Sequence, residues 1–213
     1  MTEAKLAEII KEYRVPFHIL KHMKKVAAVA LFLGKKLKDE GAEIDLIFLR
    51  QAALLHDFVK IADFPKINLD YFEEKPSAED LKVWQNIIDQ WHSIKHCYAA
   101  FEILKAKNEI ALGTIIKKHR FISLIDPVAD ERPNTLEEKI LYYADKRVRH
   151  DQIVTITERL EDGQKRYFTD GNIPKTDALV EKSLFLLEKD LLEKAKLKTS
   201  DINEKTINIY LEK

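Results

Sequence analysis

Residues 52–60 read AALLHDFVK, in which His56 and Asp57 come directly after a wholly apolar run. A charged carboxylate at the end of such a run is costly to bury unless it is paired or bound to a cation. The same feature recurs in ILYYADKRV, residues 140–148, where Asp145 also follows an apolar run. The two segments therefore predict helices whose ends bring titratable side chains into one interior site.

The rest of the chain is predicted to be almost entirely α-helical. Its 213 residues include only five Gly and six Pro, too few for the many tight turns of a sheet protein. The prevalent Lys, Glu, Leu, Ile and Ala favour helices. Cap residues and helical spacing of apolar residues predict helices over residues 3–13, 17–39, 45–62, 78–91, 93–106, 109–119, 135–149, 151–166 and 177–197.

The starts and breaks of these helices have recognisable signals. Thr2, Asp45, Ser77 and Thr135 are predicted caps, and Glu138 completes a capping box with Thr135. Breaks are expected at residues 66–76, 126–133 and 168–174. The last segment, residues 199–213, fits either a short helix or a strand. We expect one large domain, or one domain with an appendage.

Charge and composition argue against several classes of protein. Lys and Arg together number 36 and so do Asp and Glu, and the zero net charge disfavours nucleic-acid coats and binders of anionic membranes. The single cysteine, Cys97, excludes a disulfide framework and a Cys-based zinc module. No apolar run approaches the roughly 20 residues that span a bilayer, and the charged N-terminal segment lacks a signal-peptide core. We expect a cytoplasmic protein with no membrane partner.

Histidines mark the edges of other apolar stretches. Of the seven, His22, His56, His96 and His119 lie in such places, whereas we interpret His18, His92 and His150 as ordinary residues. A lone buried His is more often a hydrogen-bonded core residue, but this set together with Asp57 and Asp145 favours a divalent transition metal. Adjacent His56 and Asp57 point about 100° apart on a regular helix. Both can reach one ion only at a kink, or with Asp57 extending toward a second ion.

The ordered set resembles the HD superfamily of metal-dependent phosphohydrolases. HMKKVAAVALFLGKKL resembles the opening helix of that family, AALLHDFVK its His-Asp element with Val59 where Gly is usual, KHCYAAFEIL and IIKKHRF its next elements, and ILYYADKRV its closing element. The likeness covers residues 17–150 and is nearest the bacterial subset with dinuclear sites, which includes symmetrical diadenosine-tetraphosphate hydrolases. It implies a single helical HD domain at residues 1–150 with a helical extension at 151–213.

The resemblance also implies a site. The metal ligands would be His22, His56, Asp57, His96, His119 and Asp145, with Asp57 bridging two ions of Fe, Mn, Ni, Co or Zn. His92 lies four residues before His96 and is the alternative third histidine, but the residues that follow His96 match the family better.

The implied activity is hydrolysis of a phosphate ester or anhydride, of a nucleotide as the substrate class, by metal-activated water. Asp57 and Lys60 are the expected catalytic residues, with Lys60 one turn after His56 on the same helix. Lys60, Lys146 and Arg147 are expected to contact phosphate, and Arg149 and Arg120 are further candidates. Two alternatives stay open: an HD-family di-iron oxygenase, and a non-catalytic metal-binding helical module.

The C-terminal region carries no candidate ligand. An apolar stripe recurs at helical spacing in this region and must be buried against another surface: Leu179, Leu184, Leu187 and Leu191. We expect this stripe to pack against the domain or against a second subunit of a homodimer, and to shape the mouth of the pocket.

Overall fold

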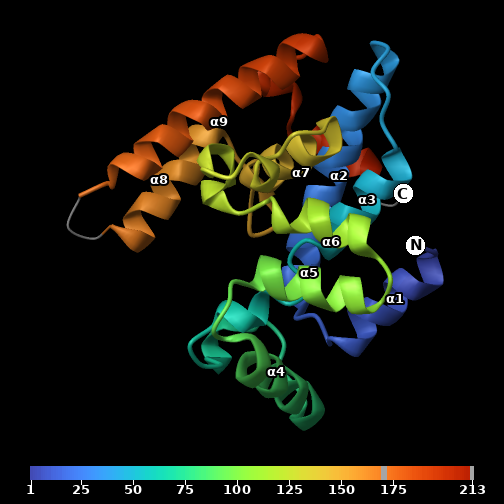
Figure 1. Ribbon diagram of the computed structural model, residues 1–213, viewed down its shortest axis with the longest axis vertical. Coiled ribbons are helices and arrows are strands. Elements are labelled where there is room, and N and C mark those ends of the chain that lie inside the picture. Colours follow the sequence, from blue (N-terminus) through green and yellow to red (C-terminus); the bar gives the residue numbers. More distant parts are fainter. Residues whose placement is uncertain (169–171, 212–213) are drawn as a thin grey trace.

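A computed structural model describes residues 1–168 and 172–211, and it confirms the all-α prediction (Figure 1). The α-helices described are α1 (Glu3–Glu12), α2 (Phe17–Asp39), α3 (Leu46–Leu55), α4 (Ala78–Trp91), α5 (His96–Ala106), α6 (Ile110–Lys117), α7 (Leu136–Lys146), α8 (Ile156–Tyr167), α9 (Lys175–Lys194) and α10 (Glu204–Ile207). The 3₁₀ turns are η1 (Lys60–Asp63), η2 (Leu69–Tyr71), η3 (Phe121–Ile125), η4 (Ala129–Glu131), η5 (Thr199–Asp201) and η6 (Asn208–Tyr210). Strands β1 (Val148–Arg149) and β2 (Gln152–Ile153) form a short antiparallel hairpin.

The predicted caps lie where the helices begin. Thr2, Asp45, Ser77 and Thr135 are the N-caps of α1, α3, α4 and α7. At α7 the Thr135 hydroxyl accepts a hydrogen bond from the Glu138 amide, and the Glu138 carboxylate accepts one from the Thr135 amide. These side chains satisfy amide groups that have no partner inside the helix.

The predicted helix over residues 45–62 is wrong at its C-terminal end. Helix α3 stops at Leu55, residues 56–59 form a turn, and η1 follows. The His56 ring donates its Nδ1 hydrogen to the carbonyl oxygen of Ala53, one of the carbonyls left unpaired at a helix end. The His-Asp pair therefore lies in a turn rather than on a regular helix.

Other boundaries also shift. Helix α5 begins at His96 rather than residue 93, and α7 ends at Lys146 because the next residues enter the hairpin. Helix α8 begins at Ile156, after its own capping residue Thr155. Of the predicted break at 168–174, residues 169–171 lie outside the described part, and Pro174 precedes α9. The described C-terminal residues form short helical turns and not a strand.

Helix α2 is the centre of the packing. It contacts α3 and α7 along its length and also meets β1, β2, α10 and η6. Its inward residues Met23, Val26 and Leu33 are fully buried. The C-terminal segment is tied to it by an ion pair, 2.6 Å long, between the Lys25 ammonium and Glu204.

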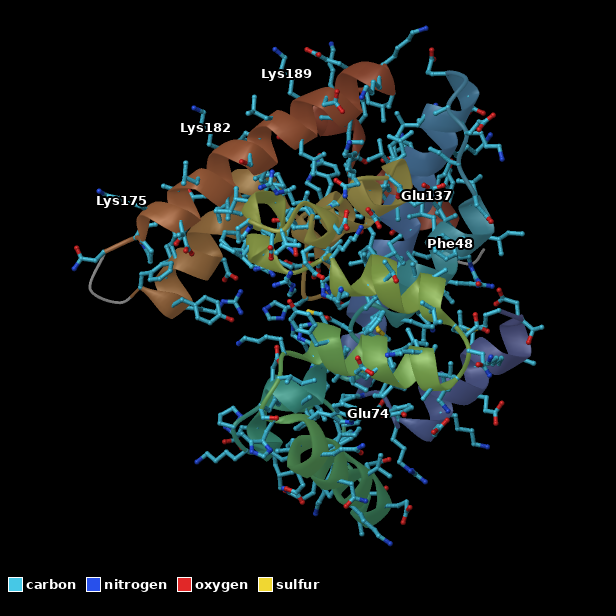
Figure 2. All side chains as sticks on the ribbon, in the orientation of Figure 1. Phe48, Glu74, Glu137, Lys175, Lys182 and Lys189 are labelled. Carbon is cyan, nitrogen blue, oxygen red and sulfur yellow. The ribbon has the colours of Figure 1, made fainter. Side chains whose placement is uncertain are left out.

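Helix α9 packs on η3 and α7 and covers one side of the fold. Its buried residues include Val180, Leu184, Leu187 and Leu191, at steps of four, three and four residues, and also Leu192. The predicted burial of Leu179 is wrong, because that side chain is 55% exposed and Val180 occupies the inward position. Lys175, Lys182 and Lys189 point outward from the same helix (Figure 2). Among the residues described, no helix combines the length and apolar character that crossing a membrane would require.

Candidate metal centre

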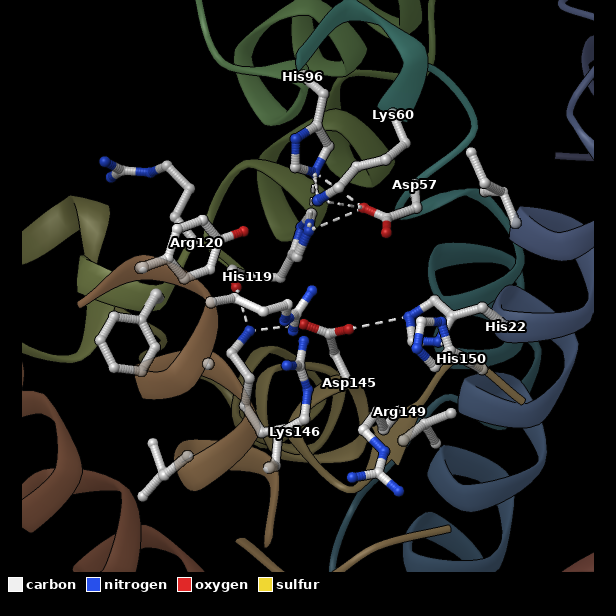
Figure 3. Close-up of a pocket in the computed structure, with 18 of the residues that line it drawn as sticks. His22, Asp57, Lys60, His96, His119, Arg120, Asp145, Lys146, Arg149 and His150 are labelled. Carbon is white, nitrogen blue, oxygen red and sulfur yellow. Dashed lines mark hydrogen bonds and ion pairs between the residues drawn. The ribbon is translucent and has the colours of Figure 1, made fainter. Parts of the chain in front are cut away.

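All six predicted ligand residues meet in the interior, carried there by five different helices or their ends (Figure 3). His22 lies on α2, His56 and Asp57 follow α3, His96 begins α5, His119 follows α6, and Asp145 lies in the last turn of α7. Only His56 and Asp57 are neighbours along the chain, and the other four residues are far from them and from one another in sequence. The site therefore depends on the packing of the whole bundle.

The four imidazoles share one orientation, with Nδ1 bonded outward and Nε2 directed inward. Three Nδ1 atoms donate to backbone carbonyl oxygens: His22 to His150 at 2.8 Å, His56 to Ala53 at 2.8 Å, and His119 to Ile116 at 2.6 Å. In its neutral form an imidazole carries one N–H, so these bonds would leave the Nε2 lone pair of each ring free for a metal. That is the form in which histidine binds a metal.

The fourth imidazole is held by a carboxylate that the sequence did not reveal. Asp63 accepts the Nδ1 hydrogen of His96 at 2.6 Å and the backbone amide hydrogen of His96 at 2.8 Å. Burial raises the pKa of Asp63, but its hydrogen bonds with His96 outweigh this and lower the pKa to about 2. Asp63 lies six residues after Asp57, and only the packing of η1 against α5 brings it to His96. No sequence motif could have indicated it.

Asp57 has one carboxylate oxygen facing each half of the centre. Its Oδ1 lies 2.8 Å from His96 Nε2 and 3.4 Å from His119 Nε2, while its Oδ2 lies 3.7 Å from His56 Nε2. This resolves the difficulty of two adjacent ligands, because the turn after Leu55 lets Asp57 reach across the centre. The carboxylate is positioned to bridge two cations.

Asp145 completes the other half. Its Oδ1 lies 3.1 Å from His22 Nε2 and 3.5 Å from His56 Nε2. Its Oδ2 accepts a hydrogen bond from Lys146 at 2.5 Å, and the same ammonium donates to the carbonyl oxygen of His119. Lys146 therefore fixes the Asp145 carboxylate while the other oxygen remains directed at the histidines.

The two carboxylates and His119 are in the protonation state that metal binding requires. Burial raises the pKa of Asp57, but Lys60 and the neighbouring imidazoles hold it well below its usual value. Burial also raises the pKa of Asp145, but Lys146 and the nearby His22 and His56 imidazoles outweigh this and hold the pKa well below its usual value. Burial lowers the pKa of His119 to about 4, so this imidazole is neutral. Burial lowers the pKa of His56 and of His96, but the Asp57 carboxylate outweighs this and raises both pKa values, so a metal would compete with protons at these two rings. Two carboxylates and at least one neutral imidazole thus face each other.

The donor atoms fit a cation. The neutral His119 ring turns its Nε2 lone pair toward Asp57 Oδ1 and toward His96 Nε2, which is 3.2 Å away. Lone pairs facing one another repel unless a proton or a metal lies between them. Within the described residues, the buried atoms His56 Nε2 and Asp57 Oδ1 have no hydrogen-bond partner. Buried polar atoms nearly always have a hydrogen-bond partner or a bound ion. A divalent cation bound between these two atoms would supply the partner that they lack.

Cys97 is a further sulfur donor close to the centre. With His96 and His119 it forms a group of side chains compact enough to hold an ion. Its Sγ lies 3.5 Å from His96 Nε2 and 3.9 Å from His96 Nδ1, so the sulfur sits beside the ring rather than beyond Nε2. An ion on the Nε2 lone pair would lie beyond that atom. The geometry therefore favours the six nitrogen and oxygen ligands without the thiol.

The remaining predicted site residues have different placements. The Lys60 ammonium lies 3.6 Å from Asp57 Oδ1 and 3.4 Å from His96 Nε2, so it reaches the centre from η1 and not from the predicted helix. Its side chain is 34% exposed. His92 bonds to the carbonyl of Ile88 and does not line the central cavity, whereas His96 lies among the other candidate ligands.

The position of Arg147 contradicts the prediction that it contacts the substrate. It is 1% exposed and is absent from the cavity wall. Its guanidinium donates to the Val154 and Ile202 carbonyl oxygens and to the Tyr143 hydroxyl. These bonds connect α7 to the hairpin and to the C-terminal segment, which is a structural role. Arg120 lines the cavity but is bound to Asp126 at 3.0 Å.

A cavity of about 730 Å³ adjoins the centre. Asp57, Asp145, His22, His96 and His119 line one part of it together with Lys60 and Lys146. Helices α8 and α9 contribute apolar groups to another part, among them Leu160, Tyr167 and Leu184. The cavity therefore combines a polar end that suits a metal and a phosphate with a wall that suits an apolar or aromatic group.

The comparisons with known proteins agree with this centre. A protein-family model described as HD domain matches residues 19–149, which is more than half of the chain. The matched range contains the six candidate ligand residues and ends before α8. Searches among curated proteins and among solved structures gave no significant match.

Proposed function

The chain belongs to the HD-domain family, and from that premise we propose that it is a metal-dependent phosphohydrolase acting on a phosphate ester or anhydride. The HD domain is typical of metal-dependent hydrolases. The observation that carries the proposal is the convergence of four Nε2 atoms on two ionised carboxylates, with buried atoms that lack a partner among the described residues, beside a cavity. A purely structural core would not collect lone pairs in this way.

The ligands divide into two groups that share Asp57. His22, His56, Asp145 and Asp57 Oδ2 would hold one divalent ion, and Asp57 Oδ1, His96 and His119 would hold the second. Ligands of nitrogen and oxygen suit Fe, Mn, Co, Ni or Zn. When bound, such ions would supply neutralisation of charge on phosphoryl oxygens and activation of water at neutral pH.

The chain's own residues would place the substrate. Lys60 projects from η1 to the centre and lines the cavity, so its ammonium can hold a phosphoryl oxygen as a point charge. In the metal-loaded protein a second cation would repel this ammonium from Asp57 and His96 toward the cavity. Lys146 also lines the cavity but is committed to Asp145 and to the His119 carbonyl, so it would act mainly on the ligand geometry.

We propose a nucleotide as the substrate class. Phe64, Phe121 and Tyr167 line the cavity that also contains the metal ligands, and a nucleobase could stack on such rings. Residues 1–150 would form the hydrolase core, and residues 151–213 would add cavity wall through α8 and α9. The extension would shape the pocket without contributing a metal ligand.

The test begins with elemental analysis of purified protein. It continues with hydrolysis assays under anaerobic conditions, using nucleotides and symmetrical diadenosine tetraphosphate, each with Mn, Fe, Co, Ni and Mg. Anaerobic phosphate release that Asp57→Ala abolishes is the expected result. Bound metal with turnover that requires dioxygen would point to the oxygenase, and absence of metal would point to a non-catalytic module.

A further inference from the structure

Two arginines on the cavity wall have guanidinium groups that make no hydrogen bond to any described residue. Arg149 lies on β1, and within the described chain its side chain makes no hydrogen bond and no ion pair. Glu158 attracts it only at longer range, and that carboxylate already accepts bonds from Thr155. Arg159 lies on α8, where its Nε is buried without a hydrogen-bond partner in the described residues. Its guanidinium forms a long ion pair with Asp162, 3.8 Å from Nη1 to the carboxylate oxygen, without a hydrogen bond.

Other cations around the same cavity are committed. Arg166 lies 2.6 Å from Asp162, and Lys21 lies 2.7 Å from Glu73. Lys146 is bound to Asp145, as described above. A guanidinium that is partly buried without a partner costs free energy, which a bound anion would recover. Unlike these cations, Arg149 and Arg159 have guanidinium groups that are free to bind an anion in the cavity.

The two arginines lie apart from the part of the centre where Lys60 is found. In Figure 3, Arg149 lies on the Asp145 side of the centre, opposite His96 and Lys60. Arg159 comes from α8, whose neighbouring Leu160 and Tyr167 also line the cavity. The cavity thus has a metal-centred anion site and a second cationic wall, with apolar side chains on α8 beside it.

We infer that Arg149 and Arg159 form a second anion subsite, and that the substrate carries a phosphate or carboxylate in addition to the phosphate that is cleaved. The inference rests on the proposed function only for the cleaved phosphate. Guanidinium groups bind both anions through paired N–H donors, which is the reason arginine rather than lysine suits this wall. The subsite would select phosphoesters that carry a second anionic group over those with a single phosphate.

The test is calorimetric binding to the metal-loaded protein with two matched pairs of probes. Adenosine 5′-monophosphate is compared with adenosine 3′,5′-bisphosphate, and glycerol 3-phosphate with 3-phosphoglycerate. The second member of at least one pair should bind about tenfold to hundredfold more tightly, as expected for charge-assisted hydrogen bonds. The pair that shows the gain identifies phosphate or carboxylate as the second anion.

Variants then assign the gain to residues. Arg149→Gln and Arg159→Gln should each remove most of it, while the affinity for the probes with a single phosphate group and the metal content stay unchanged. Arg166→Gln is the matched control, since that arginine lies on the same helix and cavity but is bound to Asp162. Arg159→Lys tests the same position if the Gln variant does not fold, and should retain charge but only part of the gain.

Two results would overturn the subsite. One is equal affinity for both members of each pair in the unaltered protein, and the other is a loss in Arg166→Gln as large as in the two test variants. Binding measured in this way does not need turnover. A protein that showed the expected binding but hydrolysed no phosphate ester would therefore refute the proposed function and retain the subsite.

Discussion

Replacing Asp63 with Asn should disable His96 as a ligand while leaving the fold intact. The carboxylate offers two acceptor oxygens to two donors of His96, the backbone N–H at 2.8 Å and the Nδ1–H at 2.6 Å. An Asn side chain at the same place has one acceptor oxygen and one NH₂ group. If its oxygen keeps the backbone amide, its NH₂ faces Nδ1, and the imidazole gains by moving its proton to Nε2. The lone pair directed at Asp57 is then lost.

The size of the effect follows from the position of Asp63. It touches no other ligand of the centre, so only the half formed by His96, His119 and Asp57 should weaken. Partners that orient metal-bound histidines contribute about tenfold to hundredfold in metal affinity. That range corresponds to about 1.4–2.7 kcal/mol. The half formed by His22, His56 and Asp145 should keep its affinity.

Two measurements check this prediction. Competition with a chromophoric chelator should show two metals bound with similar affinity in the unaltered protein and one weakened position in Asp63→Asn. Nitrogen NMR of the metal-free protein, at a pH above the raised pKa of His96, should show the His96 proton moving from Nδ1 to Nε2, a change that general loosening of the fold would not produce. Asp70→Asn, in the neighbouring turn η2 and exposed, is the control. Unchanged affinity at both positions together with an unchanged tautomer would refute the reasoning.

Three further changes probe other parts of the molecule. His119→Ala should reduce the metal content at saturation from two ions per chain to one, whereas a single ion in both proteins would remove the case for a dinuclear centre. Lys60→Met should keep the metal content but lower kcat/KM by about one to three orders of magnitude, roughly 1.4–4 kcal/mol of transition-state stabilisation, and an unchanged value on the true substrate would return Lys60 to the solvated surface. Leu184→Ala should lower the free energy of unfolding by about 2–5 kcal/mol, because its side chain is fully buried on the inward face of α9. The exposed Leu179→Ala should change the free energy of unfolding by less than about 0.5 kcal/mol. Chemical denaturation measures both variants, and an equal loss of stability in the two would contradict the packing of α9.

The sequence by itself determined the features that depend on local chemistry. Caps at Asp45 and Thr135 were predictable because a side chain satisfies amide groups two or three residues away. His56, Asp57 and Asp145 were identifiable because charged or titratable groups at the ends of apolar runs are costly without a partner. The helical class followed from composition and spacing, and each of these arguments uses residues that are neighbours along the chain.

Tertiary structure decided the features that depend on contacts between distant residues. Lys146 and Arg147 look equivalent in sequence, yet one meets Asp145 at the cavity and the other is enclosed by the Val154 and Ile202 carbonyls. Val180 rather than Leu179 faces inward because η3 and α7 set the rotation of α9. Asp63 became visible only when η1 was packed against α5. Spacing fixes which residues share a helix face, but the neighbouring elements determine where that face points and what partners it meets.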